Sequence, residues 1–302
     1  MQNRANSLQY RFDFLKFRFI FLLASLGILA FGLIFYKVHR GFIYNIDFTG
    51  GAELRLSFEK PLEIGTLRSI ISAGGWKDAA IQSLGRENKS FLIRVPNTEA
   101  SLENDITNTI KQNLAENPAS VDNIELIGPE VGKDTTWNAI MAVLISLAVL
   151  ALYIALRSEY RYGMGATAAL LHDILAVMVF ILITGEPFSV HILASVLAVL
   201  GYSLNDTIVI FSKIRENMKK YSDIASEYDI VNLSINQTLV RTTLTSFATL
   251  LCSLALFFLG GETLRGLSLI FSIGVIVGTY SSIYIASAGM LFFGSKKAAV
   301  KN

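Results

Sequence analysis

The sequence predicts a polytopic α-helical membrane protein with six transmembrane helices and one α+β domain between the first two helices. Of its 302 residues, 52% are hydrophobic and only 17% are charged. So little charge does not cover the surface of a soluble protein of this length. The apolar residues also fall in long blocks separated by polar stretches, which is typical of membrane spans.

The six apolar blocks are each long enough to cross the hydrocarbon of a bilayer, since about 20 helical residues span roughly 30 Å. The predicted spans cover residues 17–36, 137–156, 163–184, 188–211, 242–259 and 267–293. The first follows Arg4, Arg11, Lys16 and Arg18, as a signal peptide would. Its apolar run is too long for the core of a signal, however, and no small-residue cleavage site follows. We interpret it as a retained anchor.

The lysines and arginines of the tails and short loops lie mostly on one side of the predicted spans. They occur in the N-terminal tail, after the second span, after the fourth span and at the C-terminus. In order they are Arg4, Arg11, Lys16, Arg18, Arg157, Arg161, Lys213, Arg215, Lys219, Lys220, Arg241, Lys296, Lys297 and Lys301. The positive-inside rule therefore predicts that both termini are cytoplasmic and that the long loop is periplasmic. The basic residues of the long loop do not count against this, because long domains translocate largely regardless of charge.

The long loop, residues 37–135, has the pattern of a folded domain. The predicted elements are a bent strand or strand pair over 43–58 interrupted at Gly50-Gly51, a helix over 62–72, strands over 79–84 and 90–95, a helix that opens at Thr98 with Glu99 in its first turn, and a strand over 121–127. The order β-α-β-β-α-β is that of a ferredoxin-like sandwich. The loop has no cysteine and only His39, so we expect a binding or mechanical module. The chain then divides into 1–36, 37–135 and 136–302.

Two aspartates fall inside predicted spans, Asp173 in the third and Asp206 in the fourth. A charge in hydrocarbon costs about 2.5 to 3.5 kcal/mol on insertion scales, so each needs a reason. Helical spacing places Ser195, Tyr202 and Asp206 on one face of the fourth span. These residues form a polar stripe on an otherwise apolar helix.

The fifth span opens with Arg241, which enters the membrane at the same depth as Asp206. Four hydroxyl residues follow close to the same face, namely Thr242, Thr245, Ser246 and Thr249. An interior Asp206–Arg241 pair is physically reasonable, because each charge lowers the cost of burying the other, and the sequence leaves open whether the two side chains meet.

An intramembrane carboxylate in a polar stripe points to an ion or proton pathway, although a pair that only joins helices is the alternative. Burial favours the protonated form of a carboxylate and a nearby cation favours the charged form, so small movements can load and release a proton. Asp173 is either a second relay group or a helix-packing residue. His172, which we expect to point away from charged partners, and His191 are interpreted as structural.

Other features predict packing or exclude function classes. Gly274, Gly278, Ser282 and Ala286 recur every four residues in the sixth span and predict a close helix approach. The single Cys252 lies in an apolar block, so it can form no intrachain disulfide, and we expect a buried small hydrophobe. A net charge of +2 with no basic stripe argues against nucleic acid. No metal or other cofactor is indicated.

Several motifs together resemble the SecF family, the smaller partner in the SecD/SecF export complex of the resistance-nodulation-division superfamily. The resemblance covers nearly the whole chain. It rests on Asp47-Phe48-Thr49-Gly50-Gly51, residues 128–132, Leu171-His172-Asp173, the run Gly201-Tyr202-Ser203-Leu204-Asn205-Asp206, residues 214–217 and 236–246, and the Gly278 region. Departures from the pattern occur at Asn45, Ser212-Lys213 and Val240, and none of them alters Asp206 or Arg241.

The resemblance implies an auxiliary subunit of the bacterial inner membrane that pairs with SecD and associates with the SecYEG channel, with SecA and YajC as candidate further partners. It would use the proton gradient, or sodium in some members, to help pull preproteins across the membrane. Asp206 and Arg241 are then the coupling residues, with Asn205, Thr245 and Asp173 beside them. The chain would be no enzyme, and the external domain would move or hold the substrate.

Two rival functions remain. A small-molecule or lipid exporter of the same superfamily would share the intramembrane charges but typically carries a second large external insertion, which this chain lacks. An intramembrane aspartyl protease would use two aspartates such as Asp173 and Asp206. Proteases of that kind need convergent carboxylates with motif glycines, and no Gly-x-Gly-Asp run occurs.

Overall fold

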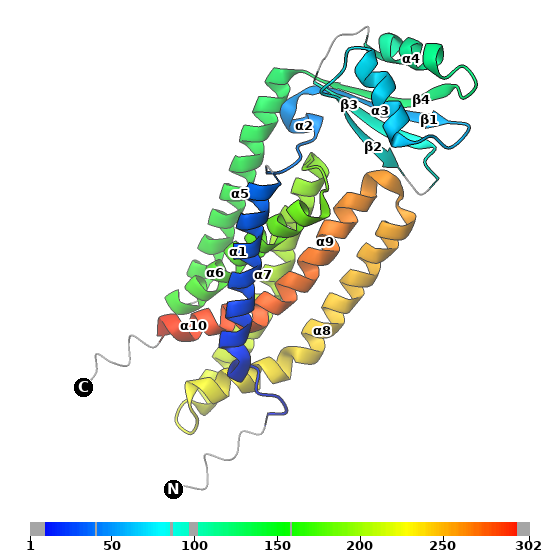
Figure 1. Cartoon of the computed structure of the whole chain (residues 1–302). Helices are drawn as coiled ribbons and strands as arrows, with labels where there is room; N and C mark the ends of the chain where they lie inside the picture. Colours follow the sequence, from blue (N-terminus) through cyan, green and yellow to red (C-terminus); the bar gives the residue numbers. More distant parts are fainter. Residues whose placement is uncertain (1–9, 40, 85–86, 97–101, 158, 295–302) are drawn as a thin grey trace. The chain divides into compact units, whose positions relative to one another are not determined.

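The computed structural model describes residues 10–39, 41–84, 87–96, 102–157 and 159–294. Contacts divide the chain into two compact units. Unit 1 comprises residues 1–43, 142–186 and 191–302, and unit 2 comprises residues 44–141 and 187–190. Figure 1 labels the helices and strands of both.

Unit 1 holds the membrane helices. Within the described residues, six helical stretches are long and apolar enough to span a bilayer. They are built from η2 (Leu15–Phe17) and α1 (Arg18–Val38), α5 (Pro129–Arg157), α6 (Tyr160–Thr184), α7 (Val190–Tyr221), α8 (Glu227–Leu259), and the run α9 (Gly261–Ser281), η3 (Ser282–Ala286) and α10 (Ser287–Gly294). This confirms the predicted set of spans, and α5 begins in unit 2.

Helix ends follow local chemistry. Ser226 caps α8, because its hydroxyl accepts a hydrogen bond from the backbone N–H of Asp229 at 3.1 Å. Gly185 ends α6 in the left-handed conformation, with φ of 68°, where glycine carries no Cβ penalty. Ser226 and Gly185 thus account for the start of α8 and the end of α6.

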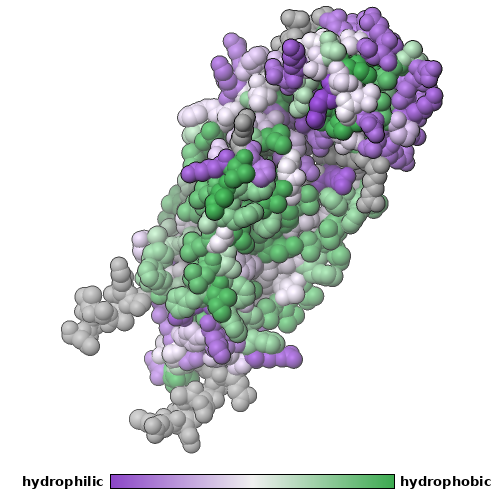
Figure 2. All heavy atoms as spheres, viewed as in Figure 1, coloured by the Kyte–Doolittle hydropathy of each residue, from purple (hydrophilic) through white to green (hydrophobic). Residues whose placement is uncertain are grey.

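The spans fall into two classes by burial. In α6, α7 and the sixth span, half or more of the apolar window is buried inside the chain, whereas in α1, α5 and α8 the share is 11%. Apolar side chains cover the outer surface of these helices (Figure 2). Cys252, expected to be buried, is exposed because it lies on the uncovered α8. Helices α6, α7 and α9 are therefore the core of unit 1.

Unit 2 contains a four-stranded antiparallel sheet with the order β2-β3-β1-β4. Its elements are α2 (Ile46–Thr49), β1 (Gly51–Phe58), α3 (Ile64–Ala73), β2 (Ala80–Leu84), β3 (Ser90–Val95), α4 (Leu102–Asn113) and β4 (Ala119–Ile127). Alternate residues of β1 pack with Leu67 and Ile71 of α3 and Ile106 and Ile110 of α4 in one hydrophobic core. Hydrophilic side chains gather on the outside of this unit (Figure 2).

The stretch from residue 43 to 58 differs from its prediction. A bent strand or a strand pair is expected there, but Ile46–Thr49 forms a short helix and only Gly51–Phe58 is a strand. Ile46 and Phe48 are both buried, a pattern that alternation alone does not separate from a strand. The predicted start of the second helix, Thr98 and Glu99, lies outside the described residues.

Candidate functional site

Asp206 is a buried carboxyl group with an unused acceptor. Its side chain lies on α7 with 2% of the residue exposed. Its Oδ2 is buried and has no hydrogen-bond partner among the described residues. The Ser246 side chain of α8 lies beside this carboxyl, and the charge of Arg241 is close enough to act on it. Because an unpartnered buried oxygen is costly, this carboxyl is the group that a proton, cation or water can satisfy.

Arg241 is the candidate partner of Asp206, but no ion pair joins them in the part of the chain that the structure describes. The reason is the phase of α8. Thr242 is buried, whereas Arg241 and Thr245, four residues apart, are exposed. The polar residues expected near one face of α8 therefore do not share it. Thr242 points inward, whereas Arg241 and Thr245 point outward.

Hydroxyl groups connect three helices next to Asp206. The Tyr202 hydroxyl on α7 donates to Ser246 Oγ at 2.8 Å, and Ser246 Oγ lies 2.7 Å from Thr279 Oγ1 on α9. Thr242 Oγ1 is buried and, like Asp206 Oδ2, has no partner among the described residues. Thr279 belongs to the motif that begins at Gly278, but it was not predicted as a site residue from the sequence. The interface of α7 and α8 thus holds two unused polar atoms beside a chain of exchangeable hydroxyl protons.

Asp173 has a different environment on α6. It has no exposed surface, its Oδ2 accepts a short hydrogen bond from the Ser203 hydroxyl of α7, and its Oδ1 lies 3.1 Å from His172 Nδ1. The His172 ring lies 6.1 Å from that of Tyr280. The expectation that His172 points away from charged partners was therefore wrong, because its imidazole reaches the adjacent side chain along the helix. Both oxygens of Asp173 are engaged.

The other side of Ser203 packs against the sixth span. Thr207 Oγ1 lies 3.0 Å from Ser282 Oγ, and Ser282 also donates to the Ser203 carbonyl at 3.3 Å. A Cβ added to Gly278 would lie 2.9 Å from the Ser203 Cβ, and one added to Gly274 would lie 2.0 Å from a Val199 methyl. Ser282 begins a π-helical turn, η3, and such turns are frequent at functional sites. The small-residue seam therefore lies against α7.

Gly201 and Asn205 lie on α7 four residues apart, and both are exposed. A Cβ added to Gly201 would meet nothing within 4 Å. Together with Arg241 and Thr245, they make up a set of polar or small residues on the surface of spanning helices, which we call the open polar face. Polar groups in spans normally face other protein rather than lipid.

The Asp47 motif has a structural explanation within unit 2. Asp47 Oδ2 accepts a hydrogen bond at 2.9 Å from the N–H of Val190, the first residue of α7. Because a helix start carries unpaired N–H groups and partial positive charge, a carboxylate there is stabilising. Gly50 and Gly51 have φ of 70° and 126°, and added Cβ atoms would lie 2.8 Å from Pro129 Cα and 2.5 Å from the Val95 carbonyl oxygen. Only glycine fits both positions.

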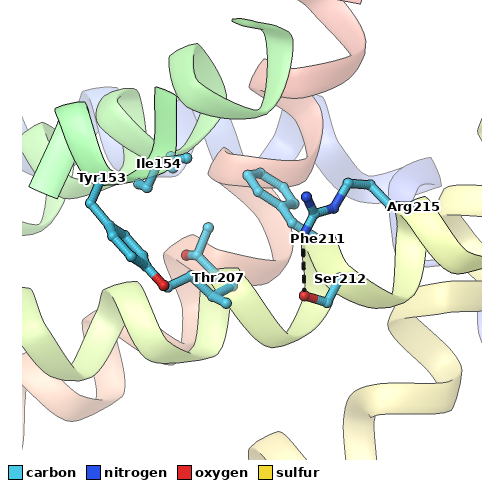
Figure 3. Close-up of a pocket in the computed structure, with 8 residues that line it drawn as sticks. Tyr153, Ile154, Thr207, Phe211, Ser212 and Arg215 are labelled. Carbon is cyan, nitrogen blue, oxygen red and sulfur yellow. Dashed lines mark hydrogen bonds between the residues drawn. The ribbon is translucent and has the colours of Figure 1, made fainter. Parts of the chain in front are cut away.

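A cavity of about 110 Å³ lies between α5, α6 and α7 (Figure 3). It is lined by Tyr153, Ile154, Ala166, Thr207, Ile208, Phe211, Ser212 and Arg215. Arg215 Nη2 donates to Ser212 Oγ at 3.4 Å. Neither Asp206 nor Arg241 lines it, so this cavity is separate from the Asp206 carboxyl and the hydroxyl groups beside it. No group of three or more metal-ligating side chains occurs within the described residues.

Comparison with known proteins finds one family. Residues 106–296 match the model described as protein export membrane protein SecD/SecF, C-terminal. The protein translocase subunit SecF of Pseudomonas aeruginosa is 38% identical over 256 residues, which is 84% of this chain and 82% of that protein. SecF of Thermodesulfovibrio yellowstonii is 35% identical over 292 residues, 96% of each chain.

Two solved structures of SecDF are also similar. The crystal structure of SecDF from Thermus thermophilus, described as a translocon-associated membrane protein, has a TM-score of 0.86 at 36% identity and covers 96% of this chain. SecDF in a super-membrane-facing form has a TM-score of 0.70 at 35% identity over the same share. This chain spans 39% and 40% of those two chains.

Proposed function

The chain belongs to the SecD/SecF family of protein-export membrane proteins, and from this premise we propose that it is an auxiliary subunit of the Sec protein translocase that uses an ion gradient to assist preprotein export. The observation that carries the proposal is the unpartnered Oδ2 of Asp206, buried between spanning helices beside a chain of hydroxyl groups.

The coupling step follows from this arrangement. When Asp206 is charged, its free oxygen favours the approach of Arg241 or of a cation, since an uncompensated charge in this environment is costly. When it binds a proton, that attraction is lost and α8 is free to move relative to α7. The coupling ion is a proton or, alternatively, sodium. Alternation between these two states converts an ion gradient into motion of the helices.

We assign Asp173 a positioning role. Both of its oxygens already have partners on α6 and α7, so it holds these helices together without an empty site for an ion. Its partners differ from those of Asp206, which also argues against a protease dyad and for a transport subunit rather than an enzyme. Asn205 and Thr245 are proposed to act on the outer side of the coupling site.

The partner on the open polar face is proposed to be SecD. One of the relatives is a single SecDF chain, and this chain matches part of it. Packing of another helix on Gly201, Asn205, Arg241 and Thr245 would remove these groups from lipid. Through SecD the subunit would associate with SecYEG, and SecA and YajC are further candidate partners.

The protein is a multi-pass protein of the bacterial inner membrane, as its SecF relatives and six apolar helices indicate. Its orientation is proposed from the distribution of lysine and arginine, with both termini cytoplasmic and residues 37–135 on the periplasmic side. We further propose that this domain is ferredoxin-like, because its strand order β2-β3-β1-β4 and helix placement match that architecture. It would hold or move the emerging preprotein.

The proposal is tested with Asp206→Asn in the assembled complex in membrane vesicles. Export of a preprotein is measured with and without an imposed proton or sodium gradient, and co-purification of SecD controls for assembly. We expect assembly to be normal and stimulation by the gradient to be lost. Full stimulation by this variant contradicts ion coupling at Asp206.

A further inference from the structure

Two asparagines of α8 bind the residues that precede the first span, outside the Asp206 and Asp173 centres. The Phe12 N–H donates to Asn236 Oδ1 at 2.9 Å, and Asn236 Nδ2 donates to the Phe12 carbonyl at 2.7 Å. The same Nδ2 donates to the Asn232 carbonyl at 2.8 Å, which fixes the orientation of the amide. One side chain therefore makes the two hydrogen bonds that a neighbouring strand makes in an antiparallel sheet.

Asn232 makes a second set of hydrogen bonds to the same segment. Its Oδ1 accepts from the Phe14 N–H at 2.9 Å, its Nδ2 donates to Asp13 Oδ1 at 2.8 Å, and the residue is fully buried. Asn232 and Asn236 thus match alternate residues of a segment that runs in the opposite direction.

Side chains on both sides of this contact add to it. The Tyr228 hydroxyl donates to Asp13 Oδ1 at 2.7 Å, and the Tyr10 hydroxyl donates to Asp229 Oδ1 at 3.3 Å. Desolvation by burial raises the pKa of Tyr10. The Phe12 side chain is 52% exposed, and the two bonds from Asn236 go to its main chain. The site therefore recognises the main chain of Phe12 rather than its side chain.

We propose that Asn232 and Asn236 form a main-chain-binding site that fastens residues 10–14 to α8. Because α1 packs against α6, this site ties α8 to α6 through the start of α1 and so sets the position of Arg241. Residues 10–14 lead directly through η2 into α1, and Arg241 lies five residues after Asn236 on α8. The inference rests on the proposed coupling role of Asp206 and Arg241. The two asparagines are positioning residues, because they act on the location of Arg241 through the helix.

The contact is tested in the full-length chain, with its partner, in native membranes. In a Cys252→Ser background, Asp13→Cys and Asn232→Cys should form a disulfide under mild oxidation. The control pair is Asp13→Cys with Ser234→Cys, because Ser234 faces α7, where it accepts a hydrogen bond from Asn217. Equal yields for the two pairs overturn the proposed contact.

Recognition of the main chain is tested by alkylation of Asp13→Cys, whose rate reports opening of the segment. Phe12→Pro removes one donor and should raise this rate roughly fivefold, and Asn236→Ala removes both bonds and should raise it roughly 30-fold. Phe12→Ala keeps the main chain and should leave the rate unchanged. Equal rates for the proline and alanine variants overturn main-chain recognition.

The positioning role is tested by export. Asn236→Ala should lower gradient-dependent stimulation severalfold. The disulfide between the cysteines introduced by Asp13→Cys and Asn232→Cys, placed in the same variant, should restore it until a reductant is added. Normal export by Asn236→Ala, with the disulfide still forming, overturns the positioning role alone. Failure of the proposed function itself is separately visible, because Asp206→Asn would then export normally.

Discussion

The two aspartates of the membrane helices lie on neighbouring helices, and their environments differ in one respect. Asp173 is fully buried and both of its oxygens have partners, from Ser203 and His172. Asp206 is almost as buried, yet its Oδ2 has none within the described residues. Burial depth therefore does not separate them, and completeness of hydrogen bonding does.

The two sides of α7 repeat this difference. Toward α6 and α9, small residues allow close contact, as at Gly278 against Ser203. Toward α8, Thr242 and Asp206 keep unused polar atoms, and Gly201 and Asn205 are exposed. A closed, satisfied side resists movement, whereas an unsatisfied side gains free energy when a ligand, water or another helix completes it. Binding of an ion can therefore drive movement on the side of α7 that faces α8.

The largest expected effect comes from the same substitution at both aspartates. Asp206→Asn should abolish stimulation of export by the ion gradient, because an amide binds no proton at neutral pH. Asp173→Asn should retain most stimulation, because its amide accepts from Ser203 and donates to His172. Export in vesicles that contain the assembled complex measures both. Equal loss in the two variants would make Asp173 a relay group and remove the distinction.

Arg241→Met should be nearly as damaging as Asp206→Asn, since the proposed coupling step needs the charge of Arg241 to approach that carboxyl. The double variant should lose no more than either single one, because residues that act as a unit are not additive. The same export assay measures this. Additive losses would show that the two residues work separately, and Lys213→Met, which removes a cation of α7 away from the site, serves as the control for loss of positive charge.

A matched pair of glycines tests the two sides of α7 as surfaces. Gly278→Ala should destabilise the folded chain by about 1 to 3 kcal/mol, because its Cβ overlaps Ser203. Gly201→Ala should leave the stability of the isolated chain unchanged, but it should weaken the association of the chain with its partner. Unfolding in detergent and co-purification distinguish these results. A stable Gly278→Ala variant would contradict the close packing of α9 on α7.

The smallest effect is expected at Thr242. Thr242→Val keeps the shape and removes a buried hydroxyl that has no partner in the described chain, so stability should change by less than about 1 kcal/mol. Gradient-dependent export should nevertheless fall, because the site loses an oxygen for the ion or its water. Ser203→Ala is the comparison on the closed side and should lower stability by about 1 to 3 kcal/mol. If Thr242→Val alters neither property, the unused hydroxyl has no role.

Part of the site could be predicted from the sequence. The cost of charge in hydrocarbon singles out Asp173 and Asp206, and helical spacing puts Tyr202 on the same face as Asp206. The sequence does not determine whether Asp206 and Arg241 meet, because matching depth does not fix the rotation of α8, and the described residues contain no ion pair between them. Spacing likewise carries no indication that Asn236 binds the main chain of Phe12.

The sequence by itself determined the number and approximate places of the spans and most elements of unit 2, because bilayer thickness and hydrophobic periodicity act along the chain. Helices α5, α7 and α8 extend 8 to 15 residues beyond the predicted spans, because polar helix ends carry no apolar signal. The sequence did not determine that Ile46–Thr49 is helical, that Cys252 is exposed, or which aspartate keeps an open oxygen. Those properties depend on atoms contributed by residues far apart in the chain. Only tertiary packing, which sets the rotation and contact of each helix, decides them.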